Sequence, residues 1–203
     1  MESNKQGSSD SFWARIRRPS TKYSVLTLAA VFFGIGMLFL GGFNAAMDVV
    51  GTLEFCGTTC HEMRDTVYKE YMQNIHYKNR TGVRAICTDC HVPRPWFQKV
   101  WRKGTAGLDV LVGKATGVVD TPEKFEAKRM EMASIEWKRM TASRSIECRA
   151  CHDFDAMDPK RQKPAARQKH DAARQEGKHC IECHKGIAHK LPKEYKGDSE
   201  EEE

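Results

Sequence analysis

The hydrophobic and polar positions divide the 203-residue chain into one long apolar segment and a polar remainder. No charged side chain occurs from residue 24 to residue 47, and most residues there are apolar. At about 1.5 Å per residue, some 20 of them span a hydrocarbon core of about 30 Å. The apolar core of a signal peptide is shorter, about 15 residues at most. We therefore predict an uncleaved transmembrane anchor helix over residues 24–47, in place of a cleaved signal or a buried core helix.

Charges beside this segment predict its orientation. Shortly before it stand the basic residues Arg15, Arg17, Arg18 and Lys22, and shortly after it the acidic residues Asp48 and Glu54. The positive-inside rule then makes residues 1–23 a cytoplasmic basic N-terminus and places the chain after about residue 48 outside the cytoplasm. Small residues let helices approach closely in a bilayer. The glycines at 34, 36, 41 and 42 therefore allow a homo-oligomer.

Residues 48–196 have few alternating positions and no long apolar run, so we predict one domain whose interior must be filled by something other than aliphatic side chains. Thr121, Pro122 and Glu123 have the N-cap, N1 proline and acidic first turn of a helix. An apolar stripe follows at helical spacing: Met130, Ala133, Trp137 and Met140. We predict that these methionines pack rather than ligate. The acidic residues 197–203 predict a disordered tail.

The cysteines carry the most specific pattern. Three segments read Cys-x-x-Cys-His: Cys87, Cys90 and His91; Cys148, Cys151 and His152; Cys180, Cys183 and His184. This pattern is typical of c-type haem attachment. Two thiols at this spacing reach the two vinyl groups of one porphyrin, and the next imidazole lies under the iron as an axial ligand.

A fourth segment has three residues between its cysteines, Cys56 and Cys60, and then His61. With it, every one of the eight cysteines is used, and four covalently attached haem c groups are predicted. Cysteine pairs also make zinc sites, and disulfides form outside the cytoplasm. Zinc does not explain a histidine after every second cysteine, and a bridge within Cys-x-x-Cys is usually strained or redox-active.

The motifs form a duplication. The separation from His61 to His91 resembles that from His152 to His184. Within each pair, one histidine stands ten or eleven residues before the next cysteine: His170 and His76. A repeated position suggests a repeated role, so we predict two dihaem halves.

Four of the eight histidines follow attachment cysteines, which leaves four others. His76, His170 and His189 are candidate sixth ligands, whereas His179, directly before Cys180, is predicted to lie on the surface. Three distal histidines for four irons leave one iron with a different ligand. Ligation by two histidines closes an iron to substrate and favours electron transfer.

Met63 stands two residues after His61 and is a candidate soft ligand of the first haem. Lys99 or Lys103 could ligate instead if deprotonated.

The formal charge of +6 is moderate and spread along the chain, so it gives no indication of nucleic-acid binding. Crowding about eight haem propionates needs nearby cations. The simpler alternative is that these lysines and arginines solvate the surface.

These residues resemble the NapC/NirT family of membrane-anchored tetrahaem quinol dehydrogenases. The matching stretches are EFC…CHEM, VYKEYMQNIHYKNRTGVRAICTDCHVP, DTPEKFEAKRMEMASIEWKRM, ECRACHDF and CIECHKGIAHKLP. The resemblance as a whole covers nearly the entire chain from residue 24 to residue 193. The resemblance implies a mainly α protein of the bacterial inner membrane. A single N-terminal transmembrane helix would hold a small, haem-filled multihaem cytochrome c domain of two dihaem halves in the periplasm.

The resemblance also implies a function. The protein would oxidise quinol at the membrane surface and pass electrons to a soluble periplasmic reductase, in first place nitrate reductase. Donation to nitrite or trimethylamine N-oxide reductase, or to several reductases, is the alternative. A rival of another class is a multihaem enzyme that reduces a small substrate itself, and a haem-delivery protein would need fewer motifs. Whether quinol oxidation makes it an enzyme stays open.

Matched to the family, His76, His170 and His189 are distal ligands, and Met63 ligates the haem nearest the membrane. Asp109 is the candidate for an acidic residue implicated in quinol binding. The three-residue spacing between Cys56 and Cys60 departs from the family pattern. No fifth motif is present, which weighs against a dedicated donor to trimethylamine N-oxide reductase.

Overall fold

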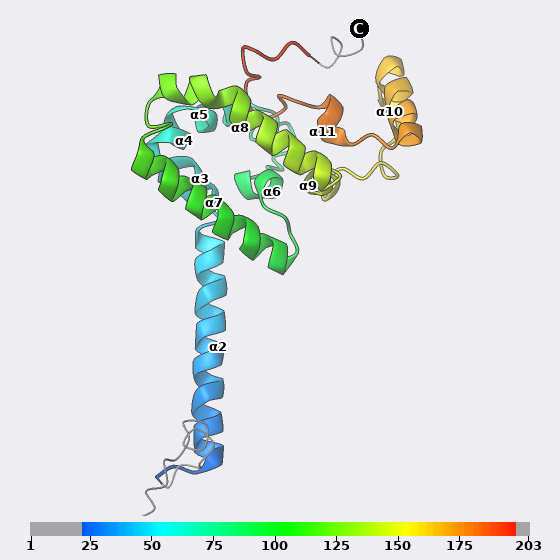
Figure 1. Ribbon diagram of the computed structural model, residues 1–203. Coiled ribbons are helices and arrows are strands. Elements are labelled where there is room, and N and C mark those ends of the chain that lie inside the picture. Colours follow the sequence, from blue (N-terminus) through cyan, green and yellow to red (C-terminus); the bar gives the residue numbers. More distant parts are fainter. Residues whose placement is uncertain (1–21, 198–203) are drawn as a thin grey trace, which may run out of the picture. The chain divides into compact units, whose positions relative to one another are not determined.

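A computed structural model of the chain describes residues 22–197 (Figure 1). Its regular structure is helical, and no strand occurs in this part of the chain, which confirms the predicted mainly α class. The chain divides into two compact units, the first up to Ala46 and the second from Met47 onward. The predicted cytoplasmic segment 1–23 falls almost wholly outside the described residues, as does the acidic tail after residue 197.

Helix α2 extends over Val25–Val49 and contains the predicted anchor. It has a mean hydropathy of 2.2 over its most apolar window, and none of its residues is buried. It is the one helix among the described residues that is long and apolar enough to cross a membrane. An apolar helix without protein around it is suited to lipid.

The second unit consists of short helices around two long ones. Its elements are α3 Leu53–Thr58, α4 His61–Asp65, α5 Val67–Tyr71, α6 Cys87–His91, α7 Trp96–Thr116, α8 Pro122–Ala142, α9 Ile146–Arg149, the 3-10 turn η1 Pro159–Arg161, α10 Pro164–Glu176 and α11 Cys180–Cys183. Helix α8 packs against α4 and α11, and α6 packs against α3 and α9. The small helices that carry the cysteines are therefore gathered around one long helix.

Helix α8 begins as its sequence predicts. The Thr121 side chain accepts a hydrogen bond of 3.3 Å from the amide of Lys124, and Pro122 takes the first helical position. Of the predicted apolar stripe, Met140 is buried and the rest is half-buried. The inward face also carries charge, because Arg129 is buried together with Phe125.

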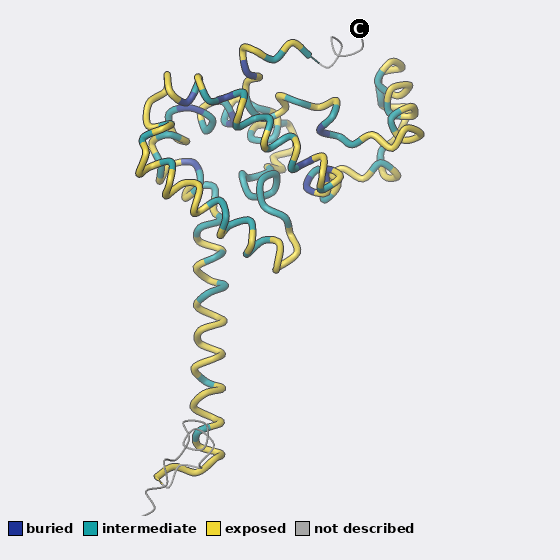
Figure 2. The backbone as a smooth tube through the Cα atoms, in the orientation of Figure 1, coloured by how far each residue is buried: buried dark blue, intermediate teal, exposed yellow. Residues whose placement is uncertain are grey.

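Few described residues of the second unit are buried (Figure 2). Among the described residues, the buried hydrophobic side chains are Tyr71, Phe125, Met140 and Ile181. Polar contacts also join segments of this unit. The Arg129 guanidinium lies 2.7 Å from the Glu70 carboxylate and donates a hydrogen bond of 3.2 Å to the carbonyl of Lys190. A domain of this size normally has a continuous apolar core. So small a core agrees with the expectation that another group fills the interior.

Candidate haem sites

The second and fourth attachment motifs each form one helical turn. Helix α6 is the sequence Cys87–His91 itself, and α11 is Cys180–Cys183 with His184 as its C-cap. Residues three apart lie on one face of a helix. Both thiols of each motif therefore face the same side, as attachment to one porphyrin requires.

An acidic residue closes each of these two turns. The Asp89 carboxylate accepts 2.8 Å from the amide of Ile86, and the Glu182 carboxylate accepts 3.0 Å from the amide of His179. A carboxylate at the third helical position that binds the N-cap amide is half of a capping box. These two acids escaped the sequence reasoning, although their shared position between the cysteines was the available signal.

The first motif is built differently because of its extra residue. Cys56 lies inside α3, whereas Cys60 has an extended backbone (φ −104°, ψ 126°) and His61 starts α4. The motif is thus divided between two helices. Gly57 is buried under the ring of Tyr68, and a Cβ there would come within 2.5 Å of that ring. Only glycine fits at this position.

The third motif follows a strained turn. Cys148 lies in α9, and Cys151 and His152 come directly after it. The two residues before α9, Arg144 and Ser145, have positive φ values of 56° and 51°. Such values are uncommon for residues other than glycine, and they hold the chain in a sharp reversal between α8 and α9.

Six of the eight histidines form three close ring pairs. The ring centroids of His76 and His152 lie 6.2 Å apart, those of His91 and His189 lie 6.2 Å apart, and those of His170 and His184 lie 5.9 Å apart. With metal–nitrogen bonds of about 2 Å, as at zinc, two imidazoles on opposite sides of one metal have centroids roughly 6 Å apart. Each pair joins one motif histidine to one predicted distal histidine, so the residues present fit haem iron.

Side-chain oxygens orient three of these rings. The Nδ1 atoms of His91, His170 and His76 lie 2.8 Å, 2.7 Å and 3.1 Å from oxygens of Glu136, Gln162 and Asn74, respectively. A hydrogen bond at one ring nitrogen fixes the tautomer and leaves the other nitrogen for a metal.

His189 is the most enclosed of the predicted distal ligands. Burial, together with the nearby His91, lowers the pKa of His189 to about 4. Its buried Nδ1 atom makes no hydrogen bond of good geometry within the described part of the chain. The imidazole is therefore neutral at pH 7, the form that binds a metal.

Glu136 joins α8 to the second motif. Burial alone would raise the pKa of Glu136, but its hydrogen bonds with His91 and Arg139 outweigh this and lower the pKa to about 2. Arg102 also lies 3.1 Å from its carboxylate. A fixed negative charge therefore stands beside the Nδ1 atom of His91, where it holds the ring in one orientation.

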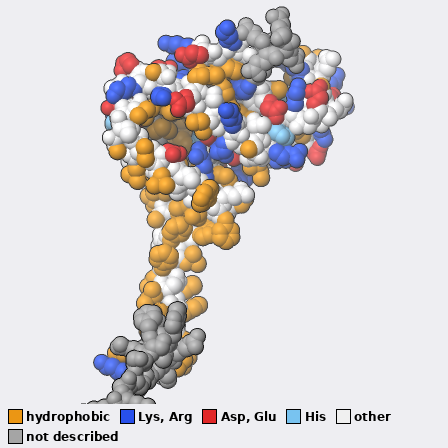
Figure 3. All heavy atoms as spheres, viewed as in Figure 1, with side chains coloured by type: hydrophobic (Ala, Val, Ile, Leu, Met, Phe, Trp, Pro, Cys, Tyr) orange, Lys and Arg blue, Asp and Glu red, His pale blue; other side chains and the backbone are white. Residues whose placement is uncertain are grey.

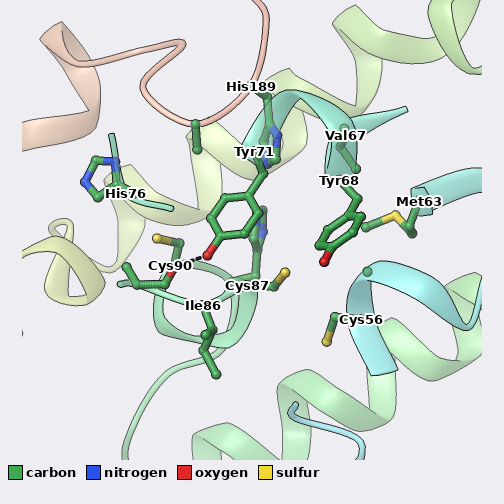
Figure 4. Close-up of a pocket in the computed structure, with 14 residues that line it drawn as sticks. Cys56, Met63, Val67, Tyr68, Tyr71, His76, Ile86, Cys87, Cys90 and His189 are labelled. Atoms are coloured by element: carbon green, nitrogen blue, oxygen red, sulfur yellow. Dashed lines mark hydrogen bonds between the residues drawn. The ribbon is translucent and has the colours of Figure 1, made fainter. Parts of the chain in front are cut away.

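A pocket joins the first two motifs (Figure 4). It has about 500 Å³ of empty space, part of it open to solvent. Its wall includes thiols, aromatic rings and candidate ligands: Cys56, Cys87, Cys90, Met63, Tyr68, Tyr71, His76, His91 and His189. Cys56 and Cys87 are close enough to hydrogen-bond, which lowers the pKa of Cys56 to about 7. The predicted ligand Met63 therefore shares one mostly apolar space with these two motifs.

His61 has no paired histidine ring among the described residues. Its side chain is half-exposed, and its Nε2 atom lies 3.3 Å from the Glu62 carboxylate. The lysine alternatives make other contacts: Lys99 lies 3.2 Å from the Asp48 carboxylate, and Lys103 donates to the carbonyl of Met47.

Two other predicted positions lie apart from the pocket. Asp109 is exposed on α7 and is not among the pocket residues, so its role stays a prediction. His179, expected on the surface, is half-buried where α11 begins.

The geometry gives no support to zinc or disulfides. All eight cysteines are described, and none of them is paired in a disulfide. Within residues 22–197, no three His, Cys, Asp or Glu side chains gather closely enough to hold a metal ion by themselves. A tetrathiolate zinc site would need four such donors.

Comparison with known proteins also indicates a c-type cytochrome. A model of the NapC/NirT cytochrome c family, N-terminal region, matches residues 18–194. The denitrification system component NirT of Stutzerimonas stutzeri is 52% identical over 190 residues, which is 94% of this chain and 92% of that protein. The cytochrome c-type protein NapC of Escherichia coli K12 is 52% identical over 180 residues, covering 89% of this chain and 88% of that protein.

The cytochrome c-type protein TorC of the same bacterium is 45% identical over 180 residues, but the match covers only 46% of that longer protein. No solved structure matches the chain.

Proposed function

The chain belongs to the NapC/NirT cytochrome c family, and on that premise we propose that it is a membrane-bound tetrahaem quinol dehydrogenase. It would oxidise membrane quinol and pass the electrons to a periplasmic reductase. The family supports the coarser description: an electron-transfer cytochrome with covalently bound haem c and one inner-membrane helix. The number of haems, the quinol and the partner are our inference.

The observation that carries this proposal is the set of three histidine pairs. Bound haem supplies one-electron redox chemistry, and the protein supplies ligands, orientation and charge. Two histidines on one iron leave no open position for a substrate. Three of the four motifs are thus equipped to transfer electrons and not to bind a small molecule.

Contacts between motifs support a relay in chain order. The first and second motifs meet at Cys56 and Cys87. The second and third meet where α6 packs on α9, and the Arg94 guanidinium lies 3.6 Å from the Cys151 sulfur. The third and fourth are joined by the Ser145 hydroxyl, which accepts 3.2 Å from the amide of Ile181. We infer that electrons pass from the first motif to the fourth.

Electron entry belongs at the first motif in this scheme, because it follows directly after helix α2. His61 and Met63 would hold that haem, and each quinol would release two electrons and two protons. Asp109 is our candidate for a proton acceptor there. The positive-inside rule makes the second unit periplasmic, and nitrate reductase is the first partner to test, before nitrite and trimethylamine N-oxide reductases.

The test is an anaerobic visible spectrum of the purified, full-length protein before and after addition of a reduced quinol analogue. We expect a c-type band that rises with quinol, and a pyridine haemochrome assay that gives four haems per chain. A band that dithionite raises but quinol does not would leave the cytochrome and remove the quinol dehydrogenase. Thr58→Ala, an exposed change between Cys56 and Cys60, should match wild type, whereas Cys60→Ala should impair the first haem.

A second function has one observation in its favour. His61 has no histidine partner within the described residues, so the first haem could have an open iron and reduce a small substrate itself. Met63, two residues on, argues against this if it ligates. Nitrite consumption by the dithionite-reduced protein, without any reductase, would establish this second function, and its absence would leave the relay.

A further inference from the structure

Helix α7 exposes its apolar side. Apolar residues recur along it at intervals of four and three: Phe97, Trp101, Gly104, Leu108, Leu111 and Ala115. At 3.6 residues per turn these positions form one stripe. Phe97 is 82% exposed, Trp101 76%, Leu108 63% and Leu111 66%, and no residue of α7 is buried. Hydrophobic side chains gather over this edge of the second unit in Figure 3.

The basic side of α7 faces the protein instead. The Arg102 guanidinium donates 3.3 Å to the carbonyl of His91 and lies 3.1 Å from the Glu136 carboxylate. Lys103 is half-buried, and Lys99 pairs with Asp48. A surface helix of a water-soluble domain normally buries its apolar stripe and exposes its charges. Here the apolar stripe is exposed, whereas the three basic side chains at positions 99, 102 and 103 contact the protein, so the stripe requires a covering from outside the domain.

Two contacts join α7 to the first two residues of the second unit. Lys103 donates to the carbonyl of Met47, and Lys99 lies 3.2 Å from the carboxylate of Asp48. Met47 and Asp48 belong to the last turn of α2. Gly51 completes the contact, because a Cβ there would lie 2.9 Å from the Lys103 ammonium. Met47 and Asp48 open the second unit and directly follow the apolar segment in the sequence, so these contacts tie α7 to the part of the second unit that is nearest in sequence to the predicted span.

We propose that the exposed stripe of α7, formed by Phe97, Trp101, Leu108 and Leu111, binds the bilayer surface as an interfacial helix. Its composition fits this partner, because tryptophan and other apolar side chains on one face with lysine and arginine on the other are typical of helices that lie in the interface. The protein would then contact the membrane twice, through α2 across the bilayer and through α7 along its surface. This inference depends on the membrane anchor but not on quinol oxidation.

A second copy of the chain is the competing occupant of the stripe. Spacing of four and three also suits paired helices. However, two of the six stripe positions are Gly104 and Ala115, which fill little of a helical seam, and two are the large aromatic residues Phe97 and Trp101. Aromatic rings are favoured at membrane interfaces, whereas the seam of a two-helix pair favours branched aliphatic side chains.

The experiment uses the full-length, haem-loaded protein in nanodiscs of phosphatidylethanolamine and phosphatidylglycerol. A fraction of the phosphatidylethanolamine carries a photoactivatable diazirine in one acyl chain. After irradiation, peptide mass spectrometry locates the lipid adducts. The matched variants are Phe97→Ser/Trp101→Ser/Leu108→Ser in the stripe and Ile75→Ser/Val83→Ser/Ile135→Ser, which changes three exposed apolar side chains outside α7. All six positions are exposed, and the c-type spectrum checks that both variants are folded.

We expect labelling of α7 on the order of tenfold above that of α10, because an interfacial helix buries its apolar face about 5–10 Å into the lipid. The stripe variant should fall to the level of α10, and the control variant should label as wild type does. Equal labelling of α7 and α10 in the wild type, or wild-type labelling of the stripe variant, would overturn the proposal. Adducts between α7 and a second chain, without lipid adducts, would replace it by a dimer. Quinol reduction of the same samples, measured separately, distinguishes failure here from failure of the proposed function.

Discussion

The two halves of the second unit share a pattern in sequence but not in contacts. The first half contains the motifs that end at His61 and His91, and the second half those that end at His152 and His184. His76 and His170 occupy equivalent positions in this repeat, yet His170 pairs with His184 of its own half, whereas His76 pairs with His152 of the other half. A sequence repeat thus predicts that a position is a ligand without predicting its partner.

The motifs within each half also differ. The last motif of each half is a single capped turn, closed by Asp89 in α6 and by Glu182 in α11. The earlier motif of each half is irregular, divided at Cys60 in the first half and preceded by the strained Ser145 in the second. Regularity therefore follows the order of motifs within a half.

Helix α8 connects the halves by charge. Arg129 binds Glu70 of the first half and the Lys190 carbonyl of the second, and Arg139 binds the Cys90 carbonyl at 3.0 Å and Glu147 at 2.5 Å. Buried arginines with several acceptors can satisfy both halves at once. An apolar contact of the same size is not directional and would not fix the position of one half against the other.

The largest effect we predict comes from breaking this connection. Arg129→Ala should lower the free energy of unfolding by about 3–5 kcal/mol, because it leaves the Glu70 carboxylate, which is only 12% exposed, with the Lys190 amide but without its ion-pair partner. Lys128→Ala removes only an exposed pair with Glu131 and should change stability by less than about 1 kcal/mol. Denaturant unfolding of the haem-loaded protein, followed by far-UV circular dichroism, measures both. Equal effects of the two substitutions would show that Arg129 does not join the halves.

The second prediction concerns the pair of His76 and His152, which joins the two halves. His76→Met should raise the potential of one haem by on the order of 0.1–0.2 V, a fraction of the roughly 0.8 V that axial ligands span. If His76 and His152 share an iron, the effects of His76→Met and His152→Met should be strongly non-additive, as for partners at one site. His76→Met and His170→Met, at different irons, should add. Spectroelectrochemical titration of the single and double variants decides between a crossed and a local pairing.

The sequence predicted the motif histidines, such as His152, for a chemical reason, since attachment needs two thiols and an adjacent imidazole. It predicted His76 and His170 from their repeated position. The start of α8 was also readable, because Thr121 and Pro122 act locally. The pairing of His76 with His152 was not readable, because the two residues are far apart in the sequence and meet only in the folded chain. The apolar stripe of α7 could have been found from the spacing of its apolar residues. That spacing shows that one face of a helix is apolar, but it does not show whether the face is buried or exposed.

A third and smaller effect is expected at the divided first motif. Gly57→Ala would place a Cβ within 2.5 Å of the Tyr68 ring, so it should cost about 1–3 kcal/mol as overpacking does. Gly104→Ala is the matched control, because a Cβ there meets nothing within 4 Å. Haem content per chain and denaturant unfolding are the measurements. Normal haem content and stability in Gly57→Ala would mean that the Tyr68 ring moves aside and that position 57 tolerates a side chain.

The last predicted effect, similar in size to the third, lies at the strained turn before the third motif. Ser145 is fully buried, has a φ of 51°, and its hydroxyl accepts 3.2 Å from the amide of Ile181 beside the fourth motif. Ser145→Ala should destabilise by about 1–3 kcal/mol, because the Ile181 amide loses its acceptor. Ser145→Gly loses the same bond but relieves roughly 1 kcal/mol of left-handed backbone strain, so it should be the milder change. Denaturant unfolding gives the free energy of unfolding of both variants and so separates the hydrogen bond from the strain. If Ser145→Gly lowers it as much as Ser145→Ala does, or more, the turn is not strained, and the hydrogen bond of the hydroxyl is the only reason for a serine at this position.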